Sequence, residues 1–135
     1  MLARLAKRRH AIAADLRERA PASYRGSVFA ARGSSRNAAM FGCHMLSTAT
    51  ATPSCIASLS VESTPGTDID YEDWLSISIS QSGRTPEIVS SLKRHLASHA
   101  RACAVTNDEN SPLAGAAEIK LVLDAGPERA VPATK

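Results

Sequence analysis

The sequence predicts an α/β domain with a five-stranded parallel sheet covered by helices on both faces. Short apolar stretches typical of buried strands alternate with helix-like stretches along the 135 residues, and such alternation at short intervals favours a parallel sheet. The composition, 44% hydrophobic and 21% charged, fits a globular chain, and no apolar run reaches the roughly 18 residues of a membrane span. A chain of this length buries roughly two-thirds of its unfolded surface, enough for one core.

The first half of the chain supplies a helix, a strand, a second helix and a second strand. Apolar residues at helical spacing predict a helix over residues 2–20, which Pro21 ends. A buried-strand pattern at 26–31 precedes a run at 38–50 that is rich in helix formers. Small and apolar residues at 53–60 predict the second strand.

The second half repeats the alternation. An acidic connection at 63–73, punctuated by Pro and Gly, leads to a strand at 75–79. Pro86 is predicted to be the first residue of a helix, and apolar residues at helical spacing extend that helix over 86–98. The remaining elements are a strand at 101–107, a short helix that opens at Ser111, and a strand at 118–124.

Basic residues are concentrated near the N-terminus. Residues 1–36 carry nine Lys or Arg against two acidic residues, whereas residues 37–135 carry seven against eleven. Asp15 and Glu18 interrupt the basic stretch, and no aromatic residues are interleaved for base stacking. A solvated helix face is therefore favoured over a nucleic-acid patch or a targeting peptide, and we expect partners that are neither nucleic acids nor membranes.

The cysteines and histidines give no metal-site or disulfide spacing. The three cysteines, Cys43, Cys55 and Cys103, are far apart and lack a C-x-x-C pair, so each is expected to be a small buried hydrophobe in a reducing cytoplasm. The histidines fall at exposed or amphipathic helix positions (His10, His95 and His99) or in an apolar helix (His44).

Two small polar turns each follow a predicted strand and precede a helix. They hold Gly33, Ser34 and Ser35 in the first turn, and Ser80, Gln81, Ser82, Gly83 and Thr85 in the second. Carboxyl ends of parallel strands meet at one edge, where ligands bind. Free N–H groups at helix starts, hydroxyl donors, and glycines that admit close approach together suit a phosphate. Serines of one turn could simply cap a helix, but two such turns on one sheet favour a ligand site.

The expected affinity is that of a metabolite. Four hydrogen bonds to a charged phosphate contribute roughly 1.5–3 kcal/mol each, and a binding cost of at least about 4 kcal/mol comes off that total. Affinity in the micromolar to millimolar range follows. The sequence contains neither G-x-G-x-x-G nor G-x-x-x-x-G-K-[ST], so a dinucleotide or nucleoside triphosphate is disfavoured and no cofactor is predicted.

Four stretches carry a resemblance to the SIS (sugar isomerase) domain family. They are "ARGSSRNA", "SQSGRTPEIV", "AVTNDENSPLAGAAE" and "AGPERAVPATK", in order along the chain. The chain is most similar to the first of two such domains in the isomerase half of glutamine-fructose-6-phosphate aminotransferase, and to related isomerases and deaminases. The resemblance implies a flavodoxin-like three-layer fold, a ligand of the fructose-6-phosphate or glucosamine-6-phosphate class, and a homodimer. A self-association surface is also expected at Met40, Phe41 and the last strand.

The resemblance also assigns positions. It implies that the phosphate lies on Ser34, Ser35, Ser80, Gln81, Ser82 and Thr85, and that Val131 and Ala133 lie near the open-chain carbonyl end of the sugar. Arg84 replaces a glutamate of the synthase, and either a phosphate contact or a solvated side chain is expected there. Ala133 replaces a serine of the synthase, which removes one sugar contact.

The family's proton-transferring glutamate, ring-opening histidine and terminal lysine belong to its second domain or tail. We therefore expect an N-terminal helix at 1–25 and, at 26–135, an abbreviated SIS domain without that second domain. Glu128 is the only carboxylate nominated as a base, although a structural role is favoured even there. Three interpretations remain open: part of an isomerase or deaminase, a module that senses sugar phosphates, and an inactive truncated product.

Overall fold

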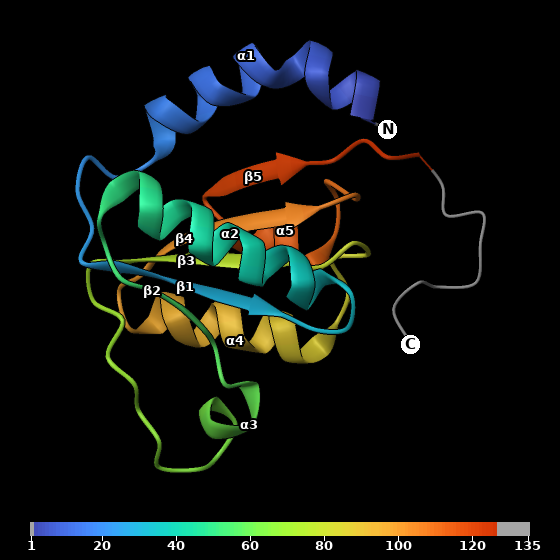
Figure 1. Cartoon of the computed structure of the whole chain (residues 1–135). Helices are drawn as coiled ribbons and strands as arrows, with labels where there is room; N and C mark the ends of the chain where they lie inside the picture. Colours follow the sequence, from blue (N-terminus) through green and yellow to red (C-terminus); the bar gives the residue numbers. More distant parts are fainter. Residues whose placement is uncertain (1, 127–135) are drawn as a thin grey trace.

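All five strands of the central sheet are parallel, in the order β2-β1-β3-β4-β5 (Figure 1). This computed structural model describes residues 2–126, with side chains from residue 6 onward. The strands are β1 (Gly26–Ala31), β2 (Ser54–Ile56), β3 (Trp74–Ile79), β4 (Arg101–Thr106) and β5 (Ile119–Val122). The order is that of flavodoxin-like sheets, so the predicted fold class is confirmed.

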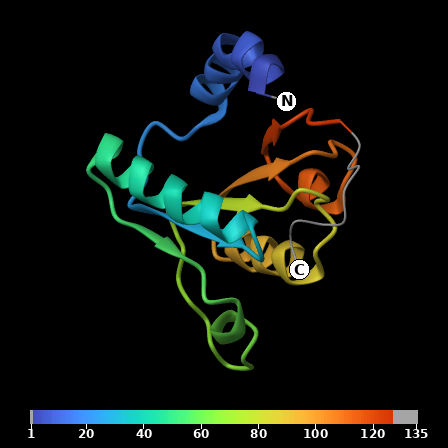
Figure 2. The same cartoon turned by 45° about the vertical axis from the view of Figure 1, so that its right-hand side comes forward.

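Helices form a layer on each face of the sheet (Figures 1 and 2). They are α1 (Leu2–Arg19), α2 (Ser35–Thr50), α3 (Leu59–Glu62), α4 (Pro86–Ala97) and α5 (Pro112–Ala116). α1 and α2 lie on one face, α4 and α5 cover the other, and the short α3 contacts α4. The predicted three-layer arrangement is therefore present.

Alternate residues of the strands pack against the helices on opposite faces of the sheet. On β1, Val28 and Ala30 share a core cluster with Ile88 and Leu92 of α4. Phe29 points the other way and packs with Ala31 of β1 and Ala39 of α2. Because successive strand residues point to opposite faces, one short strand supports both layers, and this is why its whole length is buried.

The strand predicted over 53–60 is wrong beyond its first half. β2 pairs with β1 at only three positions, Ser27↔Ser54 to Phe29↔Ile56. The chain then leaves the sheet edge, and the Glu62 N–H donates to the Ser58 carbonyl at 2.9 Å as α3 begins. The helical turn carries Glu62 into the interior, and hydrogen bonds to distant residues compensate for that burial. Local propensity gives no sign of such contacts.

Two side-chain expectations also need correction. His95 is not at an exposed position, because its side chain on α4 is fully buried. Cys55 is exposed, since it lies on the edge strand β2, whereas Cys103 on the central strand β4 is buried as expected. Burial raises the pKa of the Cys103 thiol to about 11, which disfavours the reactive thiolate.

Within residues 2–126, none of the helices combines the length and apolar character needed to cross a membrane. The same part of the chain contains no group of three His, Cys, Asp or Glu side chains placed to hold a metal ion.

Candidate functional site at the ends of β1 and β3

The two polar turns lie side by side at the point where the strand order reverses. β1 and β3 are neighbours in the sheet, and their last paired residues are Ala31 and Ile79. Each turn begins directly after this pair. An ion pair between Arg32 and Glu87, 3.1 Å between guanidinium nitrogen and carboxylate oxygen, links the start of the first turn to the first turn of α4. In flavodoxin-like sheets the crevice at this switch point is where ligands bind.

The first turn leaves its hydroxyls available. Gly33 has φ +58°, in the left-handed region that favours glycine. Ser34 stands at the N-cap of α2, but its hydroxyl makes no capping hydrogen bond. Ser34 is exposed and Ser35, the first residue of α2, is half-buried. The first turn of α2 carries no acidic residue, so no side chain there repels an anion, and helix capping does not account for Ser34.

The second turn contains a partly buried pair of hydroxyls. Ser80 Oγ and Thr85 Oγ1 are 3.0 Å apart, and Ser80 is only 5% exposed. Because one hydroxyl of such a pair donates to the other, the accepting hydroxyl keeps a proton that it can donate elsewhere. Thr85 is the N-cap of α4 but makes no capping hydrogen bond with its side chain. Ser82 is exposed, and its hydroxyl accepts from the Arg84 N–H at 3.2 Å.

A third polar segment, which follows β4, holds the second turn in shape. The Gln81 carbonyl accepts from the Thr106 hydroxyl at 3.1 Å and from the Asn107 N–H at 2.9 Å. The Gly83 carbonyl accepts from the Leu113 N–H at 3.1 Å. From the sequence, this segment was predicted as the end of the strand at 101–107 and the start of a short helix at Ser111, and it carried part of the family resemblance, but it was not placed at the site. Its position after the next strand, with a run of polar residues, was the signal that could have placed it beside the site.

Arg84 forms an ion pair with Asp108 in the segment after β4. Its guanidinium lies 2.9 Å from the Asp108 carboxylate. The pKa of Asp108 is lowered by a hydrogen bond from the Asn110 N–H and then by Arg84. The Arg84 side chain is exposed and that of Asp108 is half-buried, so solvent weakens the pair. The structure thus gives Arg84 an acidic partner, and both expectations for its role at the site stay predictions.

Of the other predicted site residues, two are described by the structure and three are not. The side chain of Gln81 is half-buried beside the turn, and Gly83 is buried with φ +62°. Glu128, Val131 and Ala133 lie outside the described residues.

Comparison with known proteins agrees with the resemblance seen in the sequence. Residues 25–135 match the SIS domain family. No curated protein matches the chain.

Several solved structures share the fold. A candidate phosphosugar isomerase from Silicibacter pomeroyi DSS-3 superposes with a TM-score of 0.74 at 32% identity, over 87% of this chain and 35% of that one. The C-terminal domain of glucosamine-fructose-6-phosphate aminotransferase from Francisella tularensis gives 0.70 at 24% identity, over 78% and 30%. The Vibrio vulnificus NanR protein, complexed with ManNAc-6P, gives 0.63 at 16% identity, over 84% and 42%. The chain thus spans about a third of the first of these proteins.

Proposed function

Because the chain belongs to the SIS domain family, we propose that it binds a phosphorylated sugar at the ends of β1 and β3. The observation that carries the proposal is the pairing of two hydroxyl-rich turns at the switch point. Neither Ser34 nor Thr85 uses its hydroxyl to cap the helix that follows. Helix capping, the main alternative for such residues, therefore does not account for them.

The chemistry of the two turns suits a phosphate monoester. The positive ends of the α2 and α4 dipoles point to the same edge of the sheet. Several N–H groups of their first turns already donate to carbonyls of the polar turns, those of Arg36, Asn37, Ile88 and Val89, so side-chain hydroxyls supply most of the remaining donors. Hydroxyl groups at or near the surface come from Ser34, Ser35 and Ser82. The partly buried Ser80–Thr85 pair contributes one further hydroxyl proton. An anion between the turns would replace water as the partner of these donors.

The intact protein's chemistry is a separate part of the proposal. We favour part of a sugar-phosphate isomerase or amino-sugar-phosphate deaminase, with Glu128 as the candidate base and Val131 and Ala133 near the sugar carbonyl. A sensing module without chemistry is the alternative, and the likeness to NanR, solved with ManNAc-6P, supports keeping it. The free cysteines Cys43, Cys55 and Cys103 favour a reducing compartment, which we take to be the cytoplasm.

Calorimetric titration of the purified chain tests the ligand class. We expect glucosamine 6-phosphate or fructose 6-phosphate to bind with a Kd between micromolar and millimolar, inorganic phosphate to bind more weakly, and unphosphorylated fructose not to bind. The reason is that charge-assisted hydrogen bonds to the phosphate supply most of the affinity. Equal binding of phosphorylated and unphosphorylated sugar would contradict the proposal.

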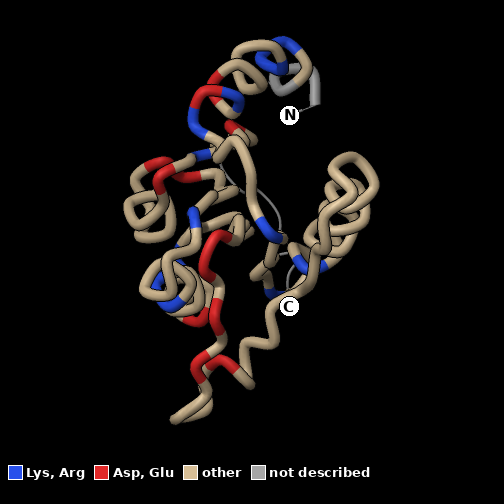
Figure 3. The backbone as a smooth tube through the Cα atoms, turned by 90° about the vertical axis from the view of Figure 1, so that its left-hand side faces the viewer, with Lys and Arg blue, Asp and Glu red and all other residues tan. Residues whose placement is uncertain are grey.

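We also propose that the chain self-associates through α2. Met40, Phe41 and Met45 on this helix are 51%, 67% and 49% exposed. Beyond Arg36 in its first turn, α2 carries no charged residue (Figure 3), so a second copy could cover it without burying a charge. Light scattering at high concentration should give a mass above one chain, and Phe41→Glu should restore the single-chain mass. A monodisperse wild-type monomer would contradict the proposal.

A further inference from the structure

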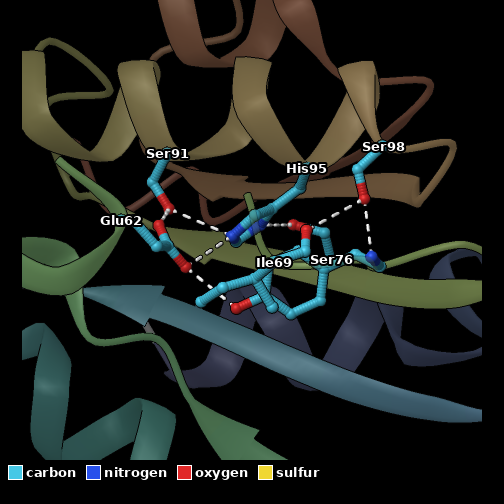
Figure 4. Close-up of polar contacts among 7 residues, drawn as sticks. Glu62, Ile69, Ser76, Ser91, His95 and Ser98 are labelled. Atoms are coloured by element: carbon cyan, nitrogen blue, oxygen red, sulfur yellow. Dashed lines mark hydrogen bonds and ion pairs between the residues drawn. The ribbon is translucent and has the colours of Figure 1, made fainter. Parts of the chain in front are cut away.

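A connected polar cluster is buried between α3, α4 and β3, away from the two turns (Figure 4). Its centre is the Glu62 carboxylate, 5% exposed. One carboxylate oxygen accepts from Ser91 Oγ at 2.6 Å. The other accepts from the Tyr71 hydroxyl at 3.0 Å and lies 2.9 Å from His95 Nε2. On the far side of the imidazole, Nδ1 lies 2.7 Å from Ser76 Oγ.

An ionised carboxylate only accepts hydrogen bonds, so His95 Nε2 and Tyr71 donate to Glu62. Ser76 meets the other ring nitrogen of His95, and every member of the cluster has a partner. Burial alone raises the pKa of Glu62, but the hydrogen bonds from His95 and Ser91 outweigh it, and the pKa lies below its ordinary value. The cluster therefore holds an ionised carboxylate at neutral pH.

The order Ser76, His95, Glu62 resembles the arrangement that activates a serine nucleophile, but burial rules out that role in this structure. The Ser76 and His95 side chains are fully buried. A substrate carbonyl could not reach Ser76 without removing α4 from the sheet. Any effect of the cluster on the candidate site is therefore transmitted through the helices and the strand that it joins.

One of these elements is α4, the helix that begins directly after the second polar turn. α4 lies on a sheet face lined by small side chains, because Ala30, Ser78 and Ala104 stand next to one another on three adjacent strands. Small side chains admit a helix closely but offer few ridges to fix its position along its own axis. The Ser78 hydroxyl is buried without a hydrogen-bond partner, so the middle of this contact supplies no polar anchor.

Polar contacts anchor α4 to β3 on either side of Ser78. At the carboxyl end of the strand, Ser80 meets Thr85, the N-cap of α4. Near the other end, Ser76 meets His95. Glu62 fixes His95 in turn, and it also binds Ser91, one turn nearer the start of the helix. Displacing α4 along its axis would break the contacts on both sides together.

We propose that Glu62 is a positioning residue for the anion site. Through His95 and Ser91 it sets the position of α4 along β3, so that Thr85 meets Ser80 and the start of α4 lies at the switch point. The ligand part of this inference rests on the proposed function. The effect on the second turn is a property of the protein without ligand, and it can be measured separately.

Amide hydrogen exchange of the ligand-free protein is the first arm of the test. Glu62→Gln keeps the size of the side chain but removes one acceptor and the charge. We expect exchange at Gly83, Ile88 and Val89, whose N–H groups bond within the turn and first helical turn, to accelerate at least tenfold. Amides of β4 and β5 should change much less. Ser91→Ala is a milder variant and should give a smaller change at the same amides. Asp68→Asn alters an exposed carboxylate in the connection between α3 and β3, and it should give no change.

Ligand affinity is the second arm. Glucosamine 6-phosphate and fructose 6-phosphate are titrated by calorimetry at a temperature where all variants are folded. We expect the affinity of Glu62→Gln to fall about tenfold, and Asp68→Asn should match wild type.

The outcomes are distinguishable. Unchanged exchange in the turn, or a uniform acceleration that includes β4, would overturn the positioning role, since the second result is plain destabilisation. If wild type binds neither sugar phosphate, the proposed function is wrong, and the exchange arm still decides whether Glu62 positions the turn. A Glu62→Gln variant that binds as wild type does, with altered exchange, would contradict the link between turn geometry and binding.

Discussion

Gly83→Ala is expected to destabilise the domain by roughly 2–5 kcal/mol and to abolish binding at the candidate site. Gly83 has φ +62°, a left-handed conformation that costs energy for any residue with a Cβ. A Cβ there would also collide with the Ser111 side chain and lie 2.8 Å from Thr106 Oγ1. Both neighbours are buried, so the turn itself would have to move. Thermal denaturation should show a melting temperature lower by on the order of 10 °C.

Gly66→Ala is the matched control. Gly66 has φ +81°, but an added Cβ there would meet nothing within 4 Å. The variant therefore isolates the conformational cost, about 1 kcal/mol, from the collision. If Gly83→Ala were no more destabilising than Gly66→Ala, the close packing of the second turn against the segment after β4 would be wrong.

The sequence predicted most of the sheet because its signals were local. The apolar stretches that became β1, β3 and β4 each end in a polar turn, and Pro86 marks the first residue of α4 as expected. The pairing of the two turns followed from topology alone, since parallel neighbouring strands end at one edge. These features needed no knowledge of distant contacts.

The parts that sequence reasoning missed depend on distant contacts. The predicted strand at 53–60 ran into the start of α3, and the helical turn was missed, because nothing local shows that Glu62 is buried against Ser91 and His95, which are 29 and 33 residues away. His95 was placed at an exposed or amphipathic position for the same reason. The support that Thr106 and Asn107 give to the second turn crosses between strands. In each case a polar side chain is stabilised by partners that only the folded chain brings near.

Replacing Ser80 and Ser82 together with alanine is expected to remove ligand binding while leaving the domain folded. Ser80 loses one hydrogen bond, to Thr85, and Ser82 loses one, from the Arg84 N–H. Each of these hydrogen bonds contributes about 1 kcal/mol to the free energy of unfolding. Neither change creates a collision, because both side chains become smaller. Binding should suffer far more, since two of the proposed phosphate donors disappear.

Thermal denaturation with and without ligand measures this directly. A ligand that binds only the folded state at about 100 times its Kd adds about 2.7 kcal/mol of stability. In wild type, millimolar glucosamine 6-phosphate or fructose 6-phosphate should therefore raise the melting temperature by several degrees. The double variant, melting cooperatively on its own, should show no shift. An equal shift in both proteins would mean that the sugar phosphate binds elsewhere, and would contradict a phosphate site at the ends of β1 and β3.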